Sequence, residues 1–202
     1  MSKKLFALFL CAFAWSPLVA QAQADAKQEL LSYLKANTGF TANFSLTATD
    51  PKGKVLNQQT GEIRGQRPNN LYLHTVSPTE NYVAVLGSSV TYYDPFVEQV
   101  TVSKLDESQP MPFIYLLSDT ASAWQQAAVS KKGSCYQVNA PQLSSSYKYL
   151  QACVVNGALT EFSYVEVNGN KATYTFTNYK SSTLNENSFK ISYPKATQVV
   201  VK

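Results

Sequence analysis

The chain has 202 residues, with 17 Lys or Arg against 13 Asp or Glu and a formal net charge of +4. The basic side chains are scattered and form no run, which excludes the basic stripe expected of a nucleic-acid-binding protein. A single histidine, His74, leaves room for at most one Ser-His-Asp or Cys-His centre.

The N-terminus has the features of a cleavable secretion signal. Lys3 and Lys4 precede an uncharged apolar run, and Ala22-Gln23-Ala24 provides the small residues that signal peptidase recognises. We expect cleavage after Ala24, with cleavage after Ala20 or Ala22 as the alternative. The signal then covers residues 1–24, and residues 25–202 form a single mature domain outside the cytoplasm.

No membrane anchor is expected to remain on the mature chain. The apolar run, residues 5–15, is shorter than the roughly 20 residues that a spanning helix needs. Leu10 stands directly before Cys11, where lipidation of a cysteine requires a small residue. The mature protein is therefore expected to carry no lipid of its own.

Two helical segments are predicted in the mature chain. The spacing of Leu30, Leu31 and Leu34 predicts an amphipathic helix over residues 25–37, which Gly39 ends. A shorter helix is predicted within residues 109–120, where a dense apolar patch follows two prolines.

The remaining sequence alternates as β-strands do, with turn chemistry at residues 50–53, 156–157 and 168–170. About a dozen antiparallel strands and few helices predict a mainly β fold with α, either a barrel or a sandwich. A sheet that curls around a cavity, with helices across its mouth, would use both helical segments. The predicted strands cover residues 40–48, 54–66, 70–76, 81–86, 89–94, 97–103, 123–130, 134–139, 147–155, 159–167, 171–180, 187–193 and 197–201.

Residues that carry chemistry are few. A lone histidine in a strand, such as His74, is more often a surface residue than a catalytic base. No HExxH, CxxC or Cys/His cluster suggests a metal, and no glycine-rich loop suggests a bound phosphate, so neither metal nor cofactor is expected. A glycosidase-type pair of distant carboxylates stays open. The chain is predicted not to be an enzyme, with an exported hydrolase as the less favoured alternative.

Two cysteines, Cys135 and Cys153, remain after cleavage, and an even pair in an oxidising compartment indicates a disulfide. Tyr136 and Val138 would share one strand face, so Cys135 points to the other. The same alternation turns Cys153 away from its apolar neighbours. A hairpin between the two segments would therefore place the sulfurs opposite each other.

The chain is rich in aromatic residues, with 13 Tyr, 10 Phe and 2 Trp. These side chains either fill a core or line a part-empty cavity for an apolar ligand. Composition alone leaves both interpretations open.

Several segments carry a family resemblance: 61–69, 92–101, 111–117, 124–126 and 189–194. Their most specific parts are Arg67-Pro68 and Asp94-Pro95-Phe96-Val97-Glu98-Gln99. In this order and spacing the mature chain resembles the periplasmic outer-membrane lipoprotein carrier family, LolA, over essentially its whole length.

The resemblance implies an incomplete antiparallel β-barrel of about 11–12 strands, with an α-helical lid over a hydrophobic cavity. It implies a periplasmic chaperone that takes lipoproteins from an inner-membrane ABC-type release complex and delivers them to an outer-membrane receptor. A monomer without stable membrane insertion or nucleic-acid partner is expected, because a carrier presents its cavity to two partners in turn. The alternative within this fold is an envelope sensor module that binds lipid or lipoprotein.

The resemblance also assigns roles to residues. Arg67 matches an arginine that latches the lid, and its five donors suit backbone carbonyls. Thr91 stands where family members often have tryptophan and Leu73 where they often have an aromatic residue, so a cavity of different shape is expected. The candidates for binding acyl chains are Leu71, Leu73, Phe113, Ile114, Leu116 and Leu117, followed by Phe44 and Ile63.

Overall fold

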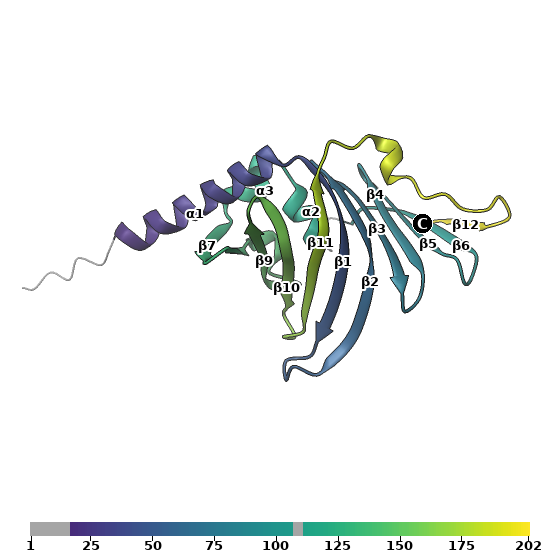
Figure 1. Cartoon of the computed structure of the whole chain (residues 1–202), viewed down its shortest axis with the longest axis horizontal. Coiled ribbons are helices and arrows are strands. Elements are labelled where there is room, and N and C mark those ends of the chain that lie inside the picture. The colour runs from purple at the N-terminus through teal and green to yellow at the C-terminus, as the bar shows by residue number, and fades with distance from the viewer. Residues whose placement is uncertain (1–16, 107–110) are drawn as a thin grey trace, which may run out of the picture.

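The computed structural model describes residues 17–106 and 111–202 and consists mainly of one curved sheet (Figure 1). The order is β12-β6-β5-β4-β3-β2-β1-β11-β10-β9-β8-β7, so the described strands end in two edges and form an incomplete barrel, as predicted. One expectation is wrong: β12 pairs with β6 in parallel, not antiparallel. The strands are β1 (Gly39–Thr49), β2 (Val55–Gln66), β3 (Asn70–Ser77), β4 (Asn81–Leu86), β5 (Ser89–Asp94), β6 (Gln99–Lys104), β7 (Ala128–Lys132), β8 (Cys135–Asn139), β9 (Tyr147–Val155), β10 (Ala158–Glu166), β11 (Lys171–Ser181) and β12 (Gln198–Val201).

Helix α1 (Pro17–Ala36) covers all but the last residue of the predicted helix. It begins within the expected signal peptide, whose apolar run lies outside the described residues. Leu30 and Leu34 are buried, as their spacing predicts. An ion pair between Glu29 and Lys131 joins α1 to β7, beside which the helix lies in Figure 1.

The centre of the sheet is tightly packed because two glycines make room for two aromatic rings. Phe40 and Phe44 of β1 face inward and stand opposite Gly65 and Gly61 of β2. A Cβ at Gly65 would collide with the Phe40 ring, and one at Gly61 with the backbone of His74. Glycine is therefore the residue that fits at both positions.

The predicted short helix is present as α2 (Pro112–Leu117). The strand predicted over residues 123–130 is wrong in its first half. Ala121–Gln125 forms helix α3, and strand β7 starts only at Ala128. Trp124 of α3 packs on Tyr115 of α2, with ring centroids 5.1 Å apart. The tertiary contact with α2 thus decides the conformation of a segment whose apolar pattern is ambiguous.

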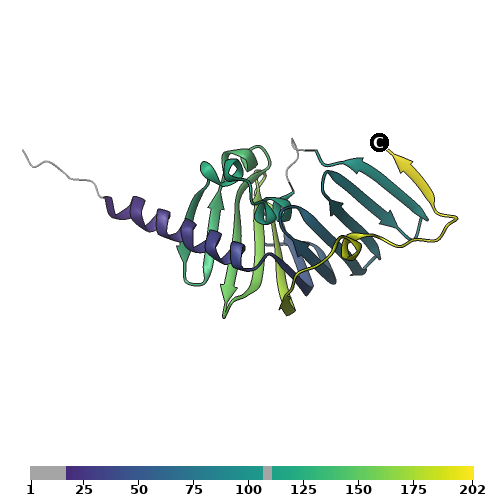
Figure 2. The ribbon, with the colours of Figure 1, turned by 90° about the horizontal axis from the view of Figure 1, so that it is seen from above.

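The predicted strand at 187–193 is also wrong. The 3-10 helix η2 (Glu186–Phe189) and an extended segment stand there, on the side of the sheet opposite α2 (Figure 2). Phe189 is only 1% exposed, because it packs on the outer face of β3 and β4. The alternating apolar residues reflect one-sided contact with a sheet, not pairing within it. The cluster that they form consists of Tyr72, Tyr82, Ala84, Leu86, Leu184, Phe189 and Ile191.

The predicted disulfide is present between Cys135 of β8 and Cys153 of β9, which stand directly opposite each other. Tyr136 and Val138 face the core, as the predicted strand faces require. The predicted turns at 50–53, 156–157 and 168–170 connect β1 to β2, β9 to β10, and β10 to β11. A second 3-10 turn, η1 (Pro141–Leu143), lies between β8 and β9.

Candidate ligand-binding cavity

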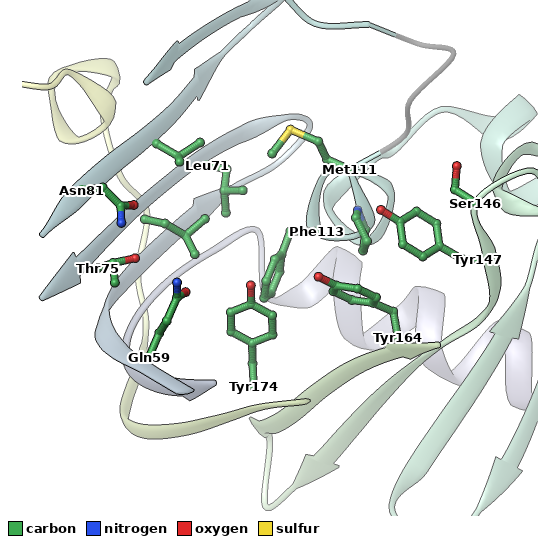
Figure 3. Close-up of a pocket in the computed structure, with 13 residues that line it drawn as sticks. Gln59, Leu71, Thr75, Asn81, Met111, Phe113, Ser146, Tyr147, Tyr164 and Tyr174 are labelled. Atoms are coloured by element: carbon green, nitrogen blue, oxygen red, sulfur yellow. The ribbon is translucent and has the colours of Figure 1, made fainter. Parts of the chain in front are cut away.

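A cavity of about 530 Å³ lies on the inner side of the sheet, beside α2 (Figure 3). Its volume is within the range of about 300–1,000 Å³ that is typical of sites for small ligands. Segments far apart in sequence form it, from β2 to β4 on one side and from β9 to β11 on the other. The residues that line it are Gln59, Leu71, Leu73, Thr75, Asn81, Val83, Met111, Pro112, Phe113, Ser146, Tyr147, Tyr164 and Tyr174.

The part of the cavity around Leu71, Leu73 and Val83 is apolar. Leu71 and Leu73 alternate with the outward-facing Tyr72, so both project inward, and Val83 of β4 stands opposite Leu73. Phe113 of α2 completes this surface and packs on Phe162, with ring centroids 4.4 Å apart. Such a surface holds hydrocarbon without leaving a polar group unpaired.

The opposite side is formed by tyrosines from three adjacent strands, which the sequence analysis did not assign to the site. Tyr147, Tyr164 and Tyr174 each have a half-buried side chain. Burial raises the pKa of all three phenols, that of Tyr164 to about 12, so they are protonated near neutral pH. The alternation along β10 and β11 places Tyr164 and Tyr174 on the core face, which is the signal that could have identified them.

The structure separates the residues predicted to bind acyl chains into two groups. Leu71, Leu73 and Phe113 line the cavity, whereas the others do not. The predicted lining is corrected for Ile63 and Phe44, which are buried in the core of the sheet, where close packing gives them no surface on this cavity. Ile114 points instead to a smaller pocket of about 250 Å³ next to α3.

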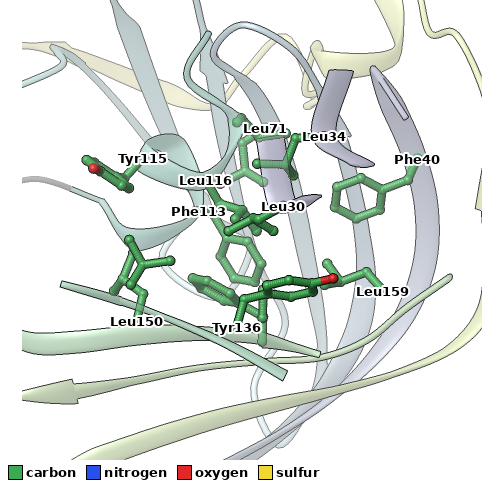
Figure 4. Packing of buried hydrophobic residues seen from close by; sticks show 14 of the residues in the cluster. Leu30, Leu34, Phe40, Leu71, Phe113, Tyr115, Leu116, Tyr136, Leu150 and Leu159 are labelled. Carbon is green, nitrogen blue, oxygen red and sulfur yellow. The ribbon is translucent and has the colours of Figure 1, made fainter. Parts of the chain in front are cut away.

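Leu116 and Leu117 are packed below α2 and are only 4% and 5% exposed. Figure 4 shows Leu116 together with Leu30 and Leu34 of α1 and with Leu71 of β3. With α2 in this position the two leucines are core residues, not cavity residues. Moving α2 away from the sheet would uncover them.

The C-terminal end of α2 is held by Arg67, which follows β2. Its Nη2 donates to the carbonyl oxygen of Ser118 at 2.8 Å, and Trp124 Nε1 donates to the same oxygen at 2.9 Å. The last carbonyls of a helix lack partners within the helix and carry partial negative charge, so a guanidinium is well suited to them.

Arg67 is held in a partly desolvated position. Burial lowers the pKa of its guanidinium, and nearby Asp119 opposes this shift. Its Nη1 is buried without a hydrogen-bond partner in the described part of the chain. Burying the unpaired Nη1 costs free energy, which offsets part of what the Nη2 bond contributes. The contact between Arg67 and Ser118 can therefore be broken.

Among the described residues, groups suited to catalysis are not gathered at the cavity. His74 lies on the outer face, where its Nε2 is 2.9 Å from Glu80 Oε1 and its ring stacks on Tyr82. Residues 17–106 and 111–202 contain no group of three or more His, Cys, Asp or Glu placed to hold a metal. Within the same ranges, no helix has the length and apolar character needed to span a membrane.

Comparison with known proteins gives consistent matches over most of the chain. Residues 35–192 match the family described as outer membrane lipoprotein carrier protein LolA. The outer-membrane lipoprotein carrier protein of Aliivibrio fischeri (strain MJ11) is 33% identical over 202 residues, covering 98% of each chain. That of Serratia proteamaculans (strain 568) is 33% identical over 174 residues, covering 85% of this chain and 86% of its own.

Among solved structures, an uncharacterised conserved protein from Thermus thermophilus aligns with a TM-score of 0.56. It covers 87% of this chain and 98% of its own, at 14% sequence identity. This similarity shows a shared fold.

Proposed function

The chain belongs to the LolA family of outer-membrane lipoprotein carriers, and on this basis we propose that it carries lipoproteins through the periplasm with their acyl chains in the cavity beside α2. The observation that carries the proposal is the partly apolar cavity of about 530 Å³, whose neighbouring helix α2 is held at its end by Arg67. Leu71, Leu73 and Phe113 provide the surface for hydrocarbon.

Energetics explain why a carrier needs such a cavity and no catalytic group. Each acyl CH2 exposed to water costs about 0.8 kcal/mol, so a long chain costs on the order of 10 kcal/mol. A lipoprotein with several chains would almost never leave a membrane unaided. An apolar cavity offsets this cost, and the release complex and receptor then exchange cargo with the carrier without covalent chemistry.

Movement of α2 would allow the cavity to grow. With α2 packed on the sheet, Leu116 and Leu117 fill space that a second or third acyl chain would need. Breaking the bond from Arg67 to Ser118 would free the end of the helix. We propose that cargo entry displaces α2 and that restoring the Arg67 contact favours release to the outer-membrane receptor.

The proposed partners are lipoprotein cargo, an inner-membrane ABC-type release complex and an outer-membrane receptor. The proposed working form is residues 25–202, a monomer without its signal. Removing residues 17–24 would shorten α1 only at its first turns, because Leu30 and Leu34 carry its contacts with the core.

Rescue in cells tests the function directly. A host depleted of its own carrier would express this chain, and lipoprotein localisation to the outer membrane would be followed. Restored localisation, with lipoprotein bound to the chain purified from the periplasm by mass spectrometry, is the expected result. Failure to rescue by an exported, folded chain would contradict the proposal.

Arg67→Leu tests the latch. Since loss of the contact weakens the closed arrangement, the variant should load cargo from spheroplasts but transfer at least tenfold less to the receptor. Arg64→Leu is the matched control, because Arg64 is a nearby arginine whose Nη1 donates to the carbonyl oxygen of Ser188 on the outer face. Normal transfer by Arg67→Leu would show that Arg67 is no latch.

A further inference from the structure

The cavity is not uniformly apolar, and its polar groups lie at one end. On β3 the lining residues run from Leu71 through Leu73 to Thr75. The strand register puts Thr75 level with Gly61 of β2 and Phe44 of β1. Leu46 is the next inward residue of β1 after Phe44, and it pairs with Tyr174 of β11. The tyrosine side of the cavity therefore lies past Thr75, away from the end that Leu71 occupies.

The other two tyrosines extend the same direction. Tyr164 of β10 pairs with Ala172, which is the next inward residue of β11 after Tyr174. Tyr147 of β9 pairs with Glu166, which lies two residues beyond Tyr164 on β10. The small side chain of Ala172 leaves room beside Tyr164. Figure 3 shows Tyr147, Tyr164 and Tyr174 with their hydroxyls directed into the cavity, opposite Leu71 and around Phe113.

The Tyr147 hydroxyl differs from other tyrosine hydroxyls of the inner face. Tyr115 donates to the carbonyl of Ala123 at 2.7 Å, and the Tyr33 and Tyr179 hydroxyls lie 3.3 Å apart and bond each other. By contrast, the Tyr147 hydroxyl bonds to no described residue. A half-buried phenol without a partner in the described part of the chain is a hydrogen-bond donor open to a ligand.

We propose that Tyr147 and Tyr164, with Tyr174 beside them, form a subsite for the carbonyl oxygens of acyl-ester linkages. This inference rests on the proposed function, since it specifies how the carrier's cavity orients an acylated ligand. The hydrocarbon tails lie toward Leu71 and Phe113, and the ester groups lie at the tyrosine end. A neutral phenol donates to an ester carbonyl, whereas a dialkyl ether has no oxygen at the carbonyl position.

The phenols are suited to this role over the physiological pH range. Burial raises the pKa of each, so each retains the proton that it would donate. Tyr147 and Tyr164 contact each other, with ring centroids 5.2 Å apart in an edge-to-face arrangement, which limits the movement of both rings. Tyr174 is the hydrogen-bond partner of Tyr164, and when Tyr174 donates, the Tyr164 proton stays free for a ligand. Two donors from neighbouring strands match the two ester carbonyls of a diacylglycerol unit.

The test compares a dioleoylglycerol with its dialkyl ether counterpart of equal chain length. Binding to residues 25–202 is measured by displacement of a dansylated fatty acid. The unmodified protein should prefer the ester about tenfold, since two neutral hydrogen bonds together contribute about that ratio. The double variant Tyr147→Phe/Tyr164→Phe should lose the preference by weakening ester binding alone.

Tyr179→Phe is the matched control, because its hydroxyl bonds Tyr33 and does not line the cavity. It should keep the preference for the ester. Equal binding of ester and ether by the unmodified protein, or a preference that survives the double variant, overturns the subsite and leaves the carrier function standing. If neither lipid binds, the proposed function fails together with the subsite.

Discussion

Two segments cover opposite faces of the sheet, and two arginines close together in sequence hold them. Arg67 binds the carbonyl of Ser118 at the end of α2 on the inner face, at 2.8 Å. Arg64 of β2 binds the carbonyl of Ser188 in η2 on the outer face, at 3.2 Å, and also lies over the ring of Tyr72. The same chemistry thus attaches a cover to each side.

The covers differ in how well they fill the space beneath them. The C-terminal segment places Phe189 deep in an aromatic cluster and leaves a gap of about 280 Å³ beside it. The inner side keeps a cavity of about 530 Å³ next to α2. A well-packed cover stabilises the sheet, whereas a cover beside unfilled space gives up dispersion contacts that a ligand can restore. We therefore expect the outer cover to act structurally and the inner cover to serve binding.

Phe189→Ala should have the largest effect on stability. Because Phe189 is 1% exposed, its removal should lower the free energy of unfolding by about 3–5 kcal/mol. Urea unfolding measures the loss, and lipid binding by the folded fraction should stay within twofold of the unmodified protein. Phe96→Ala is the control, since Phe96 is 88% exposed and should change stability by no more than about 0.5 kcal/mol. A loss of lipid binding with Phe189→Ala would mean that the outer cover also serves the cavity.

Removing the disulfide tests the end of the sheet that lies away from the outer cover. The free energy of unfolding of the variant Cys135→Ala/Cys153→Ala should be lower by about 3 kcal/mol, because the bridge joins cysteines 18 residues apart. Urea unfolding of the unmodified protein under reducing conditions should reproduce that value. If the reductant has no effect, the bridge does not stabilise β8 and β9.

Arg64→Leu should have a smaller effect, confined to the outer cover. The bond to Ser188 and the contact with Tyr72 together contribute about 1–2 kcal/mol to the free energy of unfolding. The contribution is no larger because the Arg64 side chain is 35% exposed to solvent. Limited proteolysis within residues 182–197 should accelerate, while exchange of the α2 amide protons stays unchanged. Arg67→Leu should give the opposite pattern, and identical patterns would show that the two covers are coupled.

High pH should destabilise the folded protein through the buried phenols of the inner side. Burial raises the pKa of Tyr115 on α2 and of Tyr164 at the cavity to about 12. A raised folded-state pKa contributes stability that is complete below the unfolded value, about pH 10, and is lost as pH rises toward 12. Absorbance at 295 nm should show a phenol class titrating near pH 12. Titration of every tyrosine near pH 10 without unfolding would contradict this burial.

Local patterns predicted most of the sheet because alternation, turn residues and the cysteine pair act over short distances. The strands on either side of Asp50-Pro51-Lys52-Gly53 and of Asn156-Gly157 were found this way, as was the disulfide. Phe189 and Trp124 were assigned to strands incorrectly. The apolar neighbours of both residues alternate as in a strand. Trp124, however, packs on α2, and Phe189 packs on the outer face of β3 and β4. No local pattern reveals such partners.

For the candidate site, the family resemblance suggested Leu71, Leu73 and Phe113, which line the cavity, and their contact with acyl chains stays a prediction. The same resemblance suggested Leu116 and Leu117, which belong to the packed underside of α2. Whether an apolar side chain borders a cavity or fills a core depends on the volume that its neighbours leave. That volume is a property of the whole packed arrangement.

By itself the sequence determined a mainly β chain with a short helical apolar patch after residue 110, because periodicity and turn chemistry are local. Only the tertiary structure decided that β12 runs parallel to β6, that Arg67 meets Ser118, and that Tyr147, Tyr164 and Tyr174 share one cavity. These features join residues that are distant in the chain, so they exist only once the sheet has curved and its two covers have packed.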